Sequence, residues 1–240
     1  MSSKFFKGLN KQKINYCHWK SNNKINLDSN FVDDYDLLLN SKDRKIFEKY
    51  LKTWNYKLIF VSNSIYHCVV ILKSCIIHLH IYYELKSSGL IYKNYFYPSS
   101  FLLNNNISYF KKTIRIANEY DDFVFLITRK IAEFHSPIEL IISLRNTELE
   151  DEILFFRKKK LNPKKLKQIL DQNNILNFDD FKLFQLLYLK KKYLKIIFLS
   201  FKYFFKMKKF RSKNFIFAEL IRSLIILKII FYKTIKKDSK

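Results

Sequence analysis

The stretch that decides the fold is Asp33-Asp34-Tyr35-Asp36-Leu37-Leu38-Leu39, in which an acidic start leads directly into an apolar run. A short apolar run bounded by polar residues is typical of a β-strand, so we predict a strand over Tyr35–Leu39. Ser41 can then cap a helix over Lys42–Trp54, whose apolar residues fall at helical spacing. A strand is predicted next, over Lys57–Val61.

Three further runs in the first third of the chain are rich in β-forming residues. Ile14–Trp19 is a short one, and Tyr66–Leu72 and Ile76–Tyr83 are longer. Only residues 73–75 separate the last two runs, which favours neighbouring strands in one sheet.

From about Asn104 onward the pattern becomes helical. Asp121–Glu133 is amphipathic, and several helix-start signals follow it along the chain. These signals are two capping boxes, an Asn-Pro pair and an asparagine, at Ser136–Glu139, Thr147–Glu150, Asn162–Pro163 and Asn177. The sequence therefore predicts an α+β fold, with a small mixed β-sheet domain at residues 1–105 and a basic, aromatic-rich helical domain at residues 106–240.

The composition indicates a basic globular protein. Nearly half of the residues are hydrophobic, which permits a sizeable core, and the formal net charge is +24. Such a charge favours nucleic acid or anionic membrane as a partner, but Lys, Asn, Ile, Phe and Tyr are also the residues that an AT-rich genome over-encodes. The charge alone therefore predicts a basic surface and no particular partner.

The cysteines and the first residues predict a cytoplasmic protein. Cys17, Cys68 and Cys75 are odd in number and lack the paired spacing of a metal site, which is typical of a reducing compartment. Residues 1–10 are short and basic and lack the apolar core of a secretory signal.

Asp34 and Asp36 are the candidate catalytic pair. Side chains at i and i+2 of a strand point to the same face, so the two carboxylates project together. Hard cations such as Mg²⁺ take oxygen ligands, and nucleotidyl transfer uses them to neutralise and align a triphosphate. The alternative is that these acids are only the polar start of a strand.

Beyond this pair, the stretch His18-Trp19-Lys20-Ser21-Asn22 and the later strand Ile77-His78-Leu79-His80-Ile81-Tyr82-Tyr83 carry a resemblance. With Lys93-Asn94-Tyr95 and Pro98, the chain resembles uncharacterised bacterial nucleotidyltransferases of the polymerase-β-like superfamily. The branch concerned is associated with surface-polysaccharide gene clusters. The resemblance covers roughly residues 10–105.

This resemblance implies a magnesium-dependent nucleotidyltransferase that moves a nucleoside monophosphate from a nucleoside triphosphate to an acceptor. Lys20 and Ser21 would contact the phosphates, while Asp34 and Asp36 would bind Mg²⁺. A sugar or polysaccharide intermediate is the acceptor that the family suggests.

His78 and His80 stand where the superfamily places its third acidic ligand. They alternate onto one face of a strand, and a neutral imidazole can bind a metal ion or act as a general base. A half-buried structural pair is the alternative, and Glu84 is a less favoured carboxylate nearby.

The chain also has Lys20 where the superfamily prefers glycine. The second hypothesis is therefore a catalytically degenerate domain that acts as a binding or membrane-peripheral module.

Other enzyme classes lack their motifs here. The chain has only Gly8 and Gly89, so no P-loop can be built, and neither a nucleophile elbow nor paired zinc-binding cysteines occur.

The C-terminal half interleaves lysines with aromatic residues, above all between Lys182 and Lys213. The pattern fits helices with a core-facing aromatic stripe, peripheral contact with an anionic inner membrane, or stacking on single-stranded nucleic acid, in decreasing order of preference. Phe215–Tyr232 approaches the length of a membrane span but carries Glu219, Arg222 and Lys228, which favours a core helix or an interfacial one.

Overall fold

The structure is a computed structural model that describes residues 2–19, 22, 25, 33–62, 65–72, 76–85, 99–104, 108–134 and 148–204. It confirms the predicted α+β class, because a mixed sheet is followed by a helical C-terminal region. The chain forms two compact units. The first comprises Met1–Leu85 and Pro98–Asp122, and the second includes the helices from Phe123 onward.

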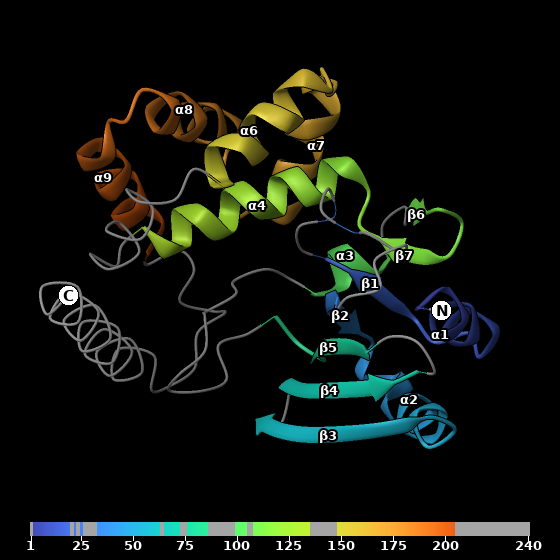
Figure 1. Cartoon of the computed structure of the whole chain (residues 1–240). Coiled ribbons are helices and arrows are strands. Elements are labelled where there is room, and N and C mark those ends of the chain that lie inside the picture. The colour runs from blue at the N-terminus through green and yellow to red at the C-terminus, as the bar shows by residue number, and fades with distance from the viewer. Residues whose placement is uncertain are drawn as a thin grey trace, which may run out of the picture. The chain divides into compact units, whose positions relative to one another are not determined.

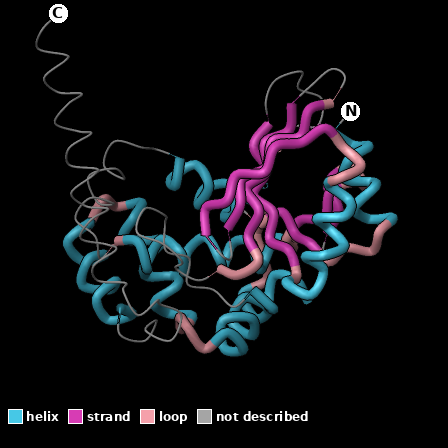
Figure 2. The backbone as a smooth tube through the Cα atoms, turned by 90° about the horizontal axis from the view of Figure 1, so that it is seen from below, coloured by secondary structure: helices cyan, strands magenta, loops and turns pink. Residues whose placement is uncertain are grey.

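The first unit is built on one seven-stranded sheet. Its strands are β1 (Tyr16–His18), β2 (Asp33–Leu39), β3 (Asn55–Ser62), β4 (Ile65–Ile71), β5 (Ile76–Tyr82), β6 (Ser108–Phe110) and β7 (Ile114–Ile116). They lie side by side in the order β3-β4-β5-β2-β1-β7-β6 (Figure 1). Figure 2 shows the strands in magenta. The β2–β5 and β1–β7 pairs are parallel and the others antiparallel. The five strands that the sequence predicts are all present, close to their predicted bounds.

The first unit extends beyond the predicted domain boundary at residue 105. β6 and β7 follow that boundary and pair with each other, and β7 joins the sheet through His18 opposite Ile116. Each of these strands has only three residues. A segment so short shows no alternation of polar and apolar residues, which is why the sequence pattern suggested helices there.

One face of the sheet is covered by two helices, α1 (Ser2–Lys11) and α2 (Arg44–Leu51), with the short 3-10 helix η2 (Ser41–Asp43) before α2. The core between them and the sheet is apolar and fully buried at most positions. Its members include Phe5, Phe6 and Leu9 of α1, Phe47 and Leu51 of α2, and Tyr35, Leu37, Leu79 and Ile81 of the sheet. The predicted cap at Ser41 is wrong by one residue, because the Asn40 side chain accepts the hydrogen bond from the Lys42 amide.

Gly8 allows α1 and α2 to approach closely. A Cβ atom built at this position would lie 2.7 Å from Cζ of Tyr50. The Tyr50 hydroxyl donates a hydrogen bond of 2.7 Å to the carbonyl of Phe5, which fixes the ring in that place. The glycine therefore serves helix packing and not phosphate binding.

The second unit is helical where the structure describes it. The helices are α4 (Glu119–Glu133, beginning in the first unit), α6 (Glu148–Lys158), α7 (Pro163–Asn173), α8 (Phe178–Leu189) and α9 (Tyr193–Phe204). The predicted starts at Asn162 and Asn177 are confirmed, since both side chains accept a hydrogen bond from the first turn. The predicted start at Ser136–Glu139 lies outside the described residues. A further short helix, α3 (Ser99–Asn104), belongs to the first unit.

None of the helices within the described ranges combines the length and the apolar character that crossing a bilayer requires. The segment Phe215–Tyr232 lies outside those ranges.

Candidate functional site

The two predicted aspartates lie together on β2. Strand geometry turns Asp34 and Asp36 to one face, while Tyr35 between them points to the core and packs edge-to-face on Phe6 with 4.9 Å between ring centroids. The side chain of Asp34 is 62% exposed and that of Asp36 is 13% exposed. The apolar residues of β2 thus hold both carboxylates on the face opposite α1 and α2.

β5 brings the two predicted histidines directly beside this pair. Its parallel register places His78 opposite Asp34 and His80 opposite Asp36. Leu79 lies between the two histidines and is fully buried. As on β2, the alternation of side chains therefore places both histidines on the face opposite the core. The sequence predicted the shared face of each pair, and the sheet register joins the two pairs.

Each histidine contacts its neighbouring carboxylate. Nδ1 of His78 lies 2.7 Å from Oδ1 of Asp34, and Nδ1 of His80 lies 3.3 Å from Oδ1 of Asp36. A carboxylate that accepts the Nδ1 hydrogen leaves the Nε2 lone pair free to bind a metal ion or accept a proton. Both histidines are about three-quarters buried, so their orientation is held by the sheet.

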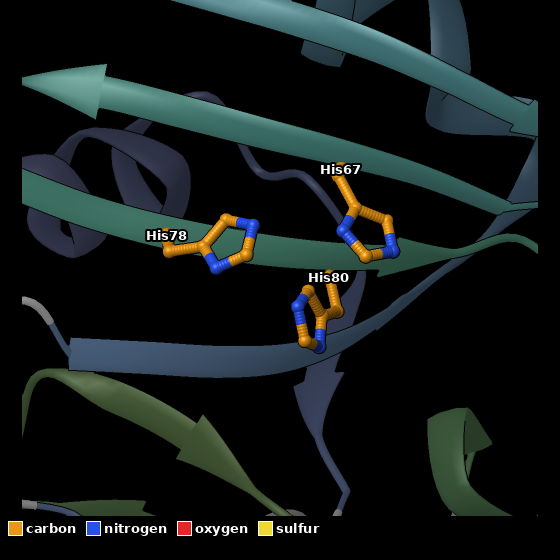
Figure 3. A group of neighbouring side chains, drawn as sticks. All are labelled: His67, His78 and His80. Atoms are coloured by element: carbon orange, nitrogen blue, oxygen red, sulfur yellow. The ribbon is translucent and has the colours of Figure 1, made fainter. Parts of the chain in front are cut away.

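A third histidine, His67 of β4, completes the cluster. It lies opposite His80 in the antiparallel β4–β5 register, and its ring centroid is 4.4 Å from that of His80 and 5.4 Å from that of His78. One ligand nitrogen from each of the three rings lies within 4.8 Å of the others (Figure 3). Burial, together with the neighbouring His80 and His78 rings, lowers the pKa of His67, which favours the neutral form of its imidazole.

His67 was not predicted as a site residue, although the sequence carries a signal for it. β4 and β5 form a hairpin in which Ile71 pairs with Ile76, and counting outward from that pair places His67 opposite His80. The predicted strands were correct, but no register was assigned to them. Paired cysteines are a common sequence sign of a zinc site, and the chain has none. The candidate ligands of this cluster are imidazoles, which that pattern does not detect.

Lys20 and Ser21 lie outside the described residues. The residues on either side of them, Trp19 and Asn22, form hydrogen bonds within the first unit. The Trp19 amide donates a hydrogen bond of 3.3 Å to the carbonyl of Asp36. His18 Nδ1 contacts Oδ1 of Asn22 at 2.6 Å, and Asn22 Nδ2 donates to Oδ2 of Asp122 at 2.9 Å. This part of the motif therefore ties β1 to the start of α4.

The described cysteines are buried thiols and not ligands in this cluster. Cys17 and Cys68 are free, and burial raises the pKa of both, that of Cys68 to about 12. Cys68 follows His67 but points to the opposite face of β4. Glu84 lies beyond the last residue of β5.

The site is thus a face of two carboxylates and three imidazoles on three adjacent strands. The carboxylates are suitable ligands for Mg²⁺ or Mn²⁺, and the imidazoles for transition-metal ions. A neutral imidazole can also accept a proton from a hydroxyl nucleophile. Comparison of the chain with models of protein families, with curated protein sequences and with solved structures finds no match.

Proposed function

We propose that the chain is a metal-dependent nucleotidyltransferase that moves a nucleoside monophosphate from a nucleoside triphosphate to an acceptor hydroxyl. One observation carries the proposal: Asp34 and Asp36 project from one face of β2, each against a histidine of β5. Paired carboxylates of this kind can hold the divalent cation that a triphosphate needs. The net charge of +24 is compatible with an anionic substrate but does not select one.

In the proposed reaction the acceptor oxygen attacks the α-phosphorus of the triphosphate. The bond from that phosphorus to the bridging oxygen of the β-phosphate breaks, and pyrophosphate leaves with the electron pair. Mg²⁺ on Asp34 and Asp36 would neutralise the phosphate oxygens and align them for in-line attack. Lys20 and Ser21 are proposed to contact the phosphates, and a sugar or polysaccharide intermediate is the proposed acceptor.

The histidines of β5 are proposed to assist this transfer. His78 or His80, which are exposed to nearly the same extent, would accept the proton from the attacking hydroxyl. The contacts with Asp34 and Asp36 support that role, because a carboxylate that accepts the Nδ1 hydrogen orients the ring and fixes the tautomer in which Nε2 carries the lone pair.

The alternative is a degenerate domain that binds nucleotide without transferring it. It is favoured by the composition of β5, which offers imidazoles and no carboxylate next to Asp34 and Asp36. The two hypotheses differ in turnover: both include binding of a nucleoside triphosphate, but only the enzyme releases pyrophosphate when an acceptor is present.

The test is calorimetric titration of the full chain with each of the four nucleoside triphosphates, with and without Mg²⁺. At least one should bind only with the metal ion, and Asp34→Asn with Asp36→Asn should weaken that binding about 100-fold, or about 2.7 kcal/mol. The charge-matched control is Asp171→Asn with Asp179→Asn on the exposed surfaces of α7 and α8. It should bind as the parent does. If a folded parent binds none of the four, or if both double variants lose binding equally, the proposal fails.

We propose peripheral binding to anionic membranes as a second function, carried by the outer face of α9. Leu194 and Phe198 are 74% and 76% exposed, and Phe201 on the same side is 49% exposed. Exposed lysines flank this apolar stripe, at Lys190, Lys191, Lys192, Lys195 and Lys202. An apolar stripe between cations is the pattern of a helix that rests on anionic lipid.

Vesicle pelleting tests this second function. The parent chain should pellet with phosphatidylglycerol-containing vesicles and less with pure phosphatidylcholine. Leu194→Ser with Phe198→Ser should weaken pelleting about 10-fold, because two apolar side chains no longer enter the lipid. Leu154→Ser, at a less exposed leucine of α6, is the control. A parent chain that stays in the supernatant with anionic vesicles would exclude this function.

A further inference from the structure

The three histidines beside the aspartates have the features of a metal site in their own right. Mutual contact of three imidazoles from two strands is chemically distinctive, because imidazole nitrogen suits Zn²⁺, Co²⁺, Ni²⁺ and Cu²⁺ better than Mg²⁺. Among the residues that the structure describes, one cluster could hold such an ion, and it consists of His67, His78 and His80.

The spacing of the ligand atoms fits one ion. At metal–nitrogen distances of about 2.0–2.1 Å, tetrahedral geometry puts two ligand nitrogens about 3.4 Å apart. The nitrogens of this cluster lie within 4.8 Å of one another. The nitrogens therefore need to approach one another by about 1.4 Å at most, which rotation of the rings about their side-chain bonds can supply.

The carboxylates give the cluster the outer shell that metal-binding histidines need. A metal-binding imidazole usually donates its second N–H to a carboxylate or carbonyl, which fixes the tautomer and the ring orientation. Asp34 and Asp36 lie at Nδ1 of His78 and His80, at 2.7 and 3.3 Å. This arrangement leaves Nε2 as the ligand atom of both rings.

The cluster is also within reach of solvent, which could supply a fourth ligand. His78 and His80 are 26% and 23% exposed, so the centre would be reached from solvent. Three protein ligands with one open position are typical of catalytic zinc sites, whereas structural sites are closed by four.

We propose that His67, His78 and His80 bind one divalent transition-metal ion of the zinc class, with Asp34 and Asp36 as positioning residues at Nδ1. The proposal does not depend on nucleotidyl transfer, since it requires no nucleotide and gives His67 a role that the magnesium site does not need. With the ion bound, Nε2 of His78 and of His80 is a ligand atom and does not accept the proton of the proposed transfer. The open position would bind water or an oxygen atom of a substrate.

The test uses the full chain, freed of metal ions and titrated with Zn²⁺ against a chromophoric chelator and with Co²⁺ by visible absorption. The parent should bind one equivalent. His67→Gln and, as a second variant, His78→Gln should each weaken binding about 100-fold, with unchanged far-ultraviolet circular dichroism. The matched control is Cys68→Ala, which removes a thiol from the opposite face of the same strand and should leave affinity unchanged.

Asp36→Asn separates positioning from ligation. It should weaken Zn²⁺ binding about 10-fold but give the parent's Co²⁺ bands at saturation, because the ligand atoms are retained. Absence of stoichiometric binding by the folded parent would overturn the proposal. Unchanged affinity in His67→Gln would do the same, and so would loss of binding in Cys68→Ala. No nucleotide is present in these titrations, so their failure is distinct from failure of the nucleotidyltransferase proposal.

Discussion

Phe6→Ala is expected to lower the free energy of unfolding of the sheet unit by about 3–5 kcal/mol. Phe6 is fully buried, and its ring contacts those of Phe5, Tyr16 and Tyr35. Truncation removes the transfer free energy of a large ring and leaves a cavity that the neighbouring aromatic side chains fill only in part.

The location of this cavity gives the prediction a functional consequence. Tyr35 lies between Asp34 and Asp36, and its ring rests on Phe6 at 4.9 Å between centroids. Loss of that support should loosen the strand segment that presents the two carboxylates. Metal-dependent nucleotide binding is therefore expected to weaken in Phe6→Ala, even though Phe6 lies on the opposite face of the sheet.

Urea unfolding followed by tryptophan fluorescence measures the stability effect. The two tryptophans of the chain, Trp19 and Trp54, both belong to the sheet unit, so their emission reports on that unit. Phe6→Leu is the control and should lose far less stability, since it keeps most of the buried volume. A loss below about 1 kcal/mol in Phe6→Ala would mean that α1 does not pack on the sheet as described.

Asp180→Ala is expected to destabilise the helical unit by about 3 kcal/mol. Oδ2 of Asp180 accepts hydrogen bonds from Nζ of Lys202 at 2.6 Å, from Nδ2 of Asn177 at 3.0 Å and from the Tyr203 hydroxyl. These contacts join the start of α8 to the end of α9. Removing the buried carboxylate takes away the acceptor that the buried Tyr203 hydroxyl and the Asn177 amide share, and it also breaks the ion pair with the exposed Lys202.

This ion pair should also make stability depend on pH. Burial alone would raise the pKa of Asp180, but the hydrogen bonds from Lys202, Tyr203 and Asn177 outweigh it and lower the pKa. A carboxyl whose pKa is lower in the folded state contributes stability above its unfolded pKa of about 3.9, and that contribution is lost as pH falls through the folded pKa.

Circular dichroism at 222 nm during urea unfolding measures both effects. The stability difference between the parent and Asp180→Asn should be constant from pH 7 to about 5 and shrink below pH 4. The unfolding transition followed by tryptophan fluorescence reports on the sheet unit and serves as an internal control. At each pH it should be the same in the parent and in Asp180→Asn. A difference that persists unchanged at pH 3 would show that the carboxylate charge is not what stabilises this contact.

The elements that the sequence predicted well are those with a strong local signal. The β2 strand follows from an apolar run after an acidic start, and the starts of α7 and α8 follow from Asn162 and Asn177, whose side chains cap their own helices. In each case the deciding interactions lie within a few residues of one another. The helix α1 was missed although Phe5, Phe6 and Leu9 stand at helical spacing. The strands β6 and β7 were missed because a three-residue strand shows no alternation and is stabilised mainly by distant partners.

By itself the sequence determined the α+β class and the shared faces of Asp34 with Asp36 and of His78 with His80, because strand alternation is a local property of the backbone. Only the tertiary structure decided that the two pairs lie side by side and that His67 joins them. Sheet order and register depend on which strands pair across dozens of residues, and that choice is made by packing of the whole core against α1 and α2. The candidate site therefore depends on the pairing register of β2, β5 and β4, which the sequence of no single strand specifies.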